Sequence, residues 1–128
     1  MTLREPSRFL NSIRAFALLV LSTLSAQGVA HHSFGMFDAD KNVTLSGTVR
    51  EFQFTNPHCW IQLLVHDAAG SVVEWSIEMS APSHLVTVGW TKNTVKPGDK
   101  ITVVIHPLKD GTSGGSFVSA TDANGHQL

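Results

Sequence analysis

The stretch Cys59–Met79, CWIQLLVHDAAGSVVEWSIEM, decides the fold because its apolar residues alternate with other residues on both sides of one short loop. Alternation with a period of two is typical of a half-buried strand. A three-residue loop at 68–70 predicts a hairpin in which every inward pair is apolar: Val65 with Val73, Leu63 with Trp75, Ile61 with Ile77 and Cys59 with Met79. A slip of one residue would turn each apolar set to the wrong face, so the register is predicted with the hairpin.

Alternating segments on either side of this hairpin predict three more strands. The segment from Val43 to Val49 alternates, and the apolar positions then shift by one place, which indicates a bulge near Glu51. The turn 95–99 (VKPGD) leads into a second alternating segment at 101–105. After a glycine-rich loop at 110–115, residues 116–122 form a last short strand.

A short helix is expected between the third and fourth strands. Ser80 followed by Pro82 is typical of a helix start, with Ser80 as the cap, and the poor helix formers at 86–89 keep the helix short. The sequence therefore predicts an all-β fold with one short helix, a five-stranded OB-like barrel in the order β-β-β-α-β-β with the helix plugging the barrel. A β-sandwich would need about seven strands.

The first thirty residues are typical of a bacterial secretory signal peptide. Three arginines precede an apolar run at 15–24, which is too short for a membrane span of about 20 residues but suits a signal core. Small residues allow cleavage after Ala30 or after Val29, and no adjacent arginine pair is present, which favours the general secretory route. A retained amphipathic anchor is the alternative.

These features predict three regions: a signal peptide at 1–30, an N-terminal arm at 31–42 and an OB-like barrel at 43–128. We expect a periplasmic or secreted monomer with no membrane contact after cleavage. Residues 31–128 keep six of the nine basic and nine of the ten acidic residues, which gives a formal charge of −3. This charge argues against a nucleic-acid partner, which needs a clustered basic surface.

The single cysteine, Cys59, excludes an internal disulfide and a cysteine-only zinc site. In an oxidising compartment an exposed thiol is a liability, so Cys59 is expected to be buried or liganded. Its predicted place opposite Met79 favours core packing over a soft Cu(I) site.

All seven histidines lie after residue 30, and three of them carry the metal hypothesis. Cleavage after Ala30 makes His31 the first residue, so its α-amine and imidazole can chelate one ion and His32 can add a further nitrogen. Cleavage after Val29 instead places His31 second and His32 third, which also provides nitrogen ligands for a planar site. Both arrangements suit copper; the alternative is a solvated tail that chelates metal only incidentally.

His58 is the third candidate ligand, because it lies at the turn Asn56-Pro57-His58, where loop residues on a rigid barrel often carry function. The alternative is a turn-closing histidine bonded to backbone. Glu74 and Glu78 share a strand face and are expected to be solvated. No special role is expected for the remaining histidines, His66, His84, His106 and His126.

An aromatic outer face is a separate candidate for ligand binding. It would combine Trp60 with Phe52 and Phe54, next to Asn56, as a stacking platform. The sequence contains no Gly-x-Ser-x-Gly, His-Glu-x-x-His or phosphate-loop motif, so a non-enzymatic role is favoured over an enzymatic one.

Five short motifs together resemble a widespread family of small secreted bacterial proteins of unknown function. They are His31-His32-Ser33-Phe34, Gly47-Thr48-Val49, Asn56-Pro57-His58, Gly89-Trp90-Thr91 and Lys96-Pro97-Gly98-Asp99. The resemblance covers nearly all of residues 30–122 and implies a periplasmic location and an OB-like fold; it does not indicate an activity. The matching residues are His31, His32, Asn56, Pro57, His58 and Trp90, whereas many relatives have another residue in place of Cys59.

The leading hypothesis is a small periplasmic binding protein that captures copper or a similar transition metal through its N-terminal histidines, with His58 as a further ligand. The alternative is a metal-independent OB-type module that uses its aromatic outer face to bind a small ligand or a periplasmic partner protein.

Overall fold

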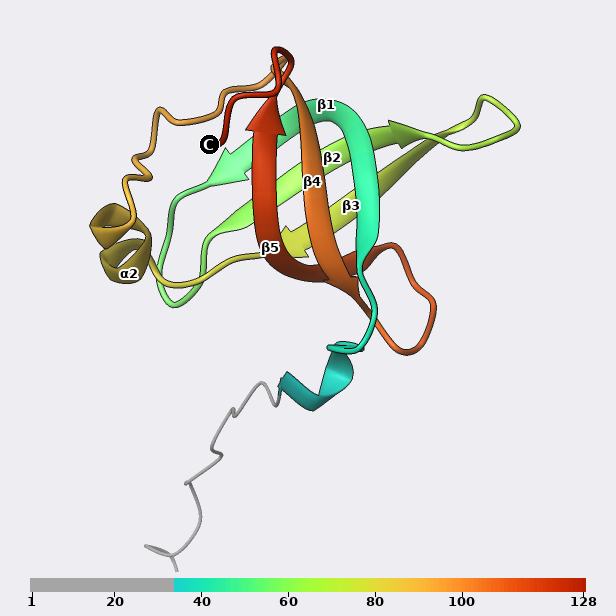
Figure 1. The fold of residues 1–128 in the computed structure, drawn as a ribbon, viewed down its shortest axis with the longest axis horizontal. Coiled ribbons are helices and arrows are strands. Elements are labelled where there is room, and N and C mark those ends of the chain that lie inside the picture. The colour runs from blue at the N-terminus through green and yellow to red at the C-terminus, as the bar shows by residue number, and fades with distance from the viewer. Residues whose placement is uncertain (1–33) are drawn as a thin grey trace, which may run out of the picture. The chain divides into compact units, whose positions relative to one another are not determined.

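A computed structural model describes residues 34–128, which form a closed barrel of five strands (Figure 1). The predicted OB-like architecture with one short α-helix in the order β-β-β-α-β-β is confirmed. A short 3-10 helix, η1 (Phe34–Met36), precedes the barrel. The other elements are β1 (Val43–Gln53), β2 (Trp60–His66), β3 (Val72–Glu78), α2 (Pro82–Thr87), β4 (Lys100–Pro107) and β5 (Gly114–Asp122).

The hairpin of β2 and β3 has the register that the apolar pattern predicts. Val65 pairs with Val73, Leu63 with Trp75 and Ile61 with Ile77. Beyond the strand ends, the amide of Met79 donates to the carbonyl of Cys59 at 2.8 Å. The side chains of Cys59, Ile61, Leu63, Ile77 and Met79 are all buried, so this hairpin supplies one wall of the core.

Strand β1 closes the barrel because it pairs with two neighbours along its length. Its first half pairs with β4 and its second half with β2, and the register with β2 shifts between Val49 and Glu51, which confirms the predicted bulge. Gly47 lies where the two pairings meet, and a Cβ there would stand 2.3 Å from the carbonyl oxygen of Leu64. This close approach of β1 and β2 requires glycine.

The barrel is completed by β5, which pairs antiparallel with β4 and parallel with the end of β3. The parallel contact joins Ser76–Glu78 to Gly114–Ser116. The last strand therefore begins at Gly114, inside the stretch predicted as a loop, because Gly114 and Gly115 are buried against β3 and β4.

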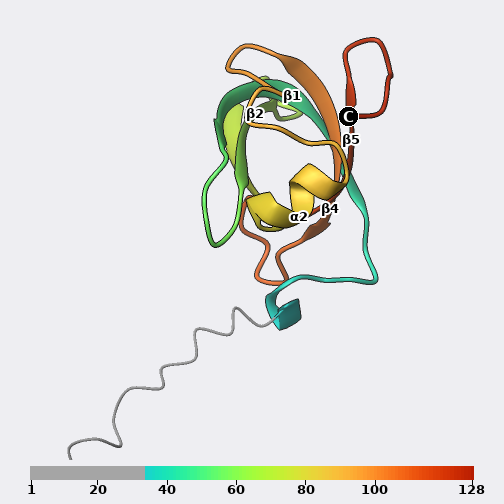
Figure 2. The same ribbon diagram turned by 90° about the vertical axis from the view of Figure 1, so that its left-hand side faces the viewer.

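Helix α2 lies across one end of the barrel (Figure 2). Its Leu85 and the following Trp90 are buried, 4% and 3% exposed, and both belong to the core. The prediction of Ser80 as the cap is wrong: the cap is Ala81, without a side-chain hydrogen bond, and Pro82 begins the helix. A helix of six residues is stabilised by this packing rather than by its own propensity.

Residues 34–42 run along the loop that joins β4 to β5. Phe37 is buried and forms a bridge with Leu108, and the amide of Asp38 donates to the carbonyl of Pro107 at 2.8 Å. Lys109 Nζ donates to the carbonyl of Gly35 at 2.9 Å. The predicted signal peptide at 1–30, and His31 and His32, lie outside the residues that the structure describes. Among residues 34–128 no helix is long and apolar enough to cross a membrane.

Candidate functional site

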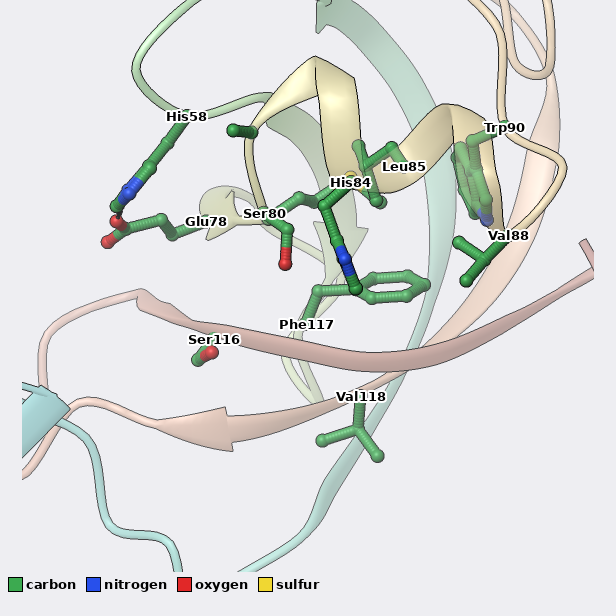
Figure 3. A pocket seen from close by; sticks show the side chains of 12 residues that line it. His58, Glu78, Ser80, His84, Leu85, Val88, Trp90, Ser116, Phe117 and Val118 are labelled. Carbon is green, nitrogen blue, oxygen red and sulfur yellow. Dashed lines mark hydrogen bonds and ion pairs between the residues drawn. The ribbon is translucent and has the colours of Figure 1, made fainter.

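A cleft of about 520 Å³ lies between α2, the end of β3 and the start of β5 (Figure 3). Its floor includes the buried side chains of Met79, Leu85 and Trp90. Its polar lining residues are His58, Glu78, Ser80, His84 and Ser116.

The imidazole of His58 is held by Glu78 at one end of this cleft. Nδ1 of His58 is bonded to Oε1 of Glu78, and the two side chains are 33% and 10% exposed. An ionised carboxylate only accepts hydrogen bonds, so in this pair Nδ1 donates. The bond orients the ring of His58 and directs Nε2 away from Glu78.

The expectation that Glu78 is solvated is wrong. Glu78 is 8% exposed, because it ends β3 between Trp60 of β2 and Ser116 of β5. Glu74 does lie at the surface, where its Oε1 contacts Arg50 Nη2 at 2.9 Å. The alternation along β3 predicts the same exposure for both glutamates. Their exposure differs because β5 pairs with β3 at Glu78 and not at Glu74.

His84 on α2 is a second imidazole in the cleft, although the sequence suggested no role for it. It is exposed, and its side chain points towards Phe117 in Figure 3. Helical periodicity could not reveal this position, because the helix is too short to show which face it presents.

The aromatic residues predicted as one outer face are divided between two surfaces. Phe52 pairs with the buried Ile61 and packs edge-on against Trp90, with ring centroids 5.8 Å apart, and Phe54 packs edge-on against Phe52. Trp60, the first residue of β2, is half-buried. It lies between Cys59 and Ile61, which both face inward, so its side chain points outward.

Asn56 is exposed in the turn before β2, in a cis peptide bond with Pro57. Because Phe52 and Phe54 pack against the core and Trp60 points outward, the three aromatic side chains do not form one face.

Three other histidines make local contacts outside the cleft. His66 Nδ1 lies 3.4 Å from the carbonyl of Gly70, and His106 Nδ1 lies 2.8 Å from the carbonyl of Lys41. His126 Nδ1 lies 3.2 Å from Asp122 Oδ2. Across residues 34–128 no three His, Cys, Asp or Glu side chains converge as a metal-binding group.

Cys59 has the environment of a core residue. It is fully buried, and its Sγ donates to the carbonyl of Thr55 at 3.9 Å. Burial raises the pKa of the Cys59 thiol, which disfavours the thiolate that a metal would need. The predicted burial is confirmed.

Comparison with known proteins adds a family and one structural likeness. The crystal structure of the mitochondrial single-stranded DNA binding protein Rim1 from S. cerevisiae is similar, with 12% sequence identity, a TM-score of 0.48, and coverage of 65% of this chain and 94% of that chain. No curated protein matches the sequence. The model of the family of unknown function DUF6152 matches residues 18–117, and the chain belongs to this family.

Proposed function

We propose that the protein is a small periplasmic binding protein that captures copper or a similar transition-metal ion through the imidazoles of His31, His32 and His58. The support from the sequence is the export pattern, which makes His31 or Ala30 the first residue, and the suitability of amine and imidazole nitrogens for Cu(II). In this proposal the protein carries or senses the ion and does not transform a substrate.

Within the described residues, the hydrogen bond between His58 and Glu78 carries the proposal. Metal-ligating histidines commonly donate their second ring nitrogen to a carboxylate, which orients the ring and increases its basicity as a ligand. Because Glu78 is buried and Nδ1 is bonded to it, Nε2 is the nitrogen of His58 that would bind metal. The donor chemistry of the pair therefore fits a transition metal.

Titration of the exported, processed protein with Cu(II) tests this proposal. Intact mass first fixes the cleavage point, and calorimetry against a competing chelator then measures affinity. We expect submicromolar binding that falls by about 100-fold or more in His31→Ala/His32→Ala. Submicromolar binding that survives the double substitution would overturn the proposal.

The role of His58 has its own matched control. His58→Asn and Glu78→Gln are each expected to weaken Cu(II) binding by about tenfold or more, because the first removes a ligand and the second removes the carboxylate that supports it. His66→Asn replaces an exposed histidine on the β2–β3 hairpin and is expected to leave the affinity unchanged. Equal effects of His58→Asn and His66→Asn would remove His58 from the site.

A further inference from the structure

The cleft beside α2 has the dimensions of an organic-ligand site, which the capture of a metal ion does not require. Its volume of about 520 Å³ lies within the range of pockets that hold small molecules. Its lining changes character along its length: Glu78 and His58 lie at one end, and Val88 and Trp90 lie at the other (Figure 3). A ligand that fills it therefore needs one polar end and one apolar end.

The polar end carries a negative charge. Among the described residues that line the cleft, Glu78 is the only acidic one, and none is lysine or arginine. The other titratable groups that line the cleft, within residues 34–128, are His58 and His84. The carboxylate of Glu78 uses Oε1 for His58, and no described residue hydrogen-bonds to Oε2. A carboxylate accepts several hydrogen bonds, so a ligand N–H donor can bind at Oε2.

The apolar end carries exposed side chains on both rims. Val88, after α2, is 61% exposed, and Val118 on β5 is 43% exposed. Between them lies Phe117, whose ring packs edge-on against Trp90 with centroids 5.5 Å apart. An apolar group seated here would remove both valines from water and contact the Phe117 ring.

We propose that this cleft binds a small primary amine with an aromatic or branched apolar body. The ammonium group donates to Glu78 Oε2, and the body lies against Val88, Phe117 and Val118, which line the same cleft. Charge selects the ammonium over a carboxylate, because an anion would face Glu78 at one end of the cleft. This site is independent of His31 and His32.

Three probes of the same shape test the proposal: phenethylamine, phenethyl alcohol and hydrocinnamate, each titrated with EDTA present and followed by amide NMR. We expect shifts at residues 78–90 and 116–118. Because a charge-assisted hydrogen bond exceeds a neutral one, the amine should bind about tenfold or more tightly than the alcohol, and the carboxylate should bind more weakly than both. Equal binding of the three probes, or shifts confined to other residues, would overturn the proposal.

Single substitutions test the two ends of the cleft separately, beginning with the polar end. Glu78→Gln is expected to reduce the affinity for phenethylamine by about tenfold while leaving phenethyl alcohol unchanged. Glu74→Gln, at the exposed end of the same strand, is expected to change neither. An amine affinity that Glu78→Gln leaves intact contradicts the proposal.

Substitutions of two exposed valines test the apolar end of the cleft. Val88→Ser is expected to weaken binding of the amine and of the alcohol equally, by several-fold, whereas Val86→Ser, which lies on α2 and outside the cleft, should weaken neither. This pair decides the outcome even where Glu78→Gln fails to fold. Amine binding should persist in His31→Ala/His32→Ala, so failure of the copper proposal and failure of this one are distinguishable.

Discussion

His58 and Glu78 are 20 residues apart in the sequence, and their side chains are bonded at the end of the cleft. The pair links the turn between β1 and β2 to the last residue of β3. Formation of the barrel therefore sets the orientation of the imidazole, because Glu78 is held between its neighbours on β2 and β5.

Loss of this bond should destabilise the protein more than loss of a surface ion pair. We expect Glu78→Ala to lower the free energy of unfolding by about 2 kcal/mol, since a mostly buried charged hydrogen bond is removed. Glu74→Ala removes the exposed contact with Arg50 and should cost about 0.5 kcal/mol or less. Urea denaturation measures both, and equal losses would contradict the buried role of Glu78.

Gly47 is expected to be among the least replaceable residues of the barrel. In Gly47→Ala the new methyl group would overlap the Leu64 carbonyl oxygen, so β1 and β2 must separate, at about 3 kcal/mol or more. Gly70→Ala is the matched control: it adds a methyl group to open space at a positive φ of 85°, which costs about 1 kcal/mol. Thermal denaturation of the two variants checks this order, and a Gly47→Ala protein as stable as Gly70→Ala would contradict the close strand approach.

Low pH should lower the stability of the folded protein, in part through protonation of Asp122. The amides of His126 and Asn124 donate to its Oδ1 at 2.9 and 2.8 Å, and these hydrogen bonds, that of His126 foremost, lower its pKa below the ordinary value of 3.8. Because the pKa of Asp122 is lower in the folded state than in the unfolded state, its carboxylate contributes fully to stability above the unfolded-state pKa. This contribution is lost as the pH falls through the folded-state pKa.

Asp122→Asn removes this titration. Its urea midpoint should therefore fall less than that of the unmodified protein as the pH is lowered from about 5 to about 2. Identical pH profiles for the two proteins would show that Asp122 does not contribute to the acid sensitivity.

Cys59 should be inert in the folded protein. It is 0% exposed, and burial raises the pKa of its thiol, so both access and thiolate formation are suppressed. We expect its reaction with a disulfide reagent at about pH 8 to be slower by on the order of 100-fold or more than in denaturant, because it proceeds only through opening of the barrel. A native rate equal to the denatured rate would contradict its place in the core.

The parts of the fold that depend on local patterns were predictable, and those that depend on distant pairing were not. The β2–β3 hairpin follows from alternation on both sides of one loop, and the bulge in β1 follows from a shift of that alternation. Burial of Glu78 depends on a parallel contact with β5, and the place of His84 depends on how α2 packs on the barrel. Neither contact leaves a periodic signal.

The same distinction applies to the candidate site. The position of His58 after Asn56-Pro57 at a turn indicates a functional residue, whereas the alternation along β3 places its partner Glu78 on a solvated face. The inward turn of Phe52 and Phe54 follows from the register after the bulge, which places Phe52 opposite the buried Ile61. Pairwise geometry, rather than residue type, assigned these side chains to the core.

The spectrum of a Cu(II) ion bound to the processed protein tests the proposed function most directly. Electron paramagnetic resonance with one equivalent of Cu(II) should show coupling to several nitrogens, and the coupling should decrease in His58→Asn and remain unchanged in His66→Asn. The coupling should decrease further in His31→Ala/His32→Ala, because that variant loses two of the three proposed imidazole ligands. A nitrogen-coupled spectrum that is the same in the double variant as in the unmodified protein would contradict metal capture by these histidines.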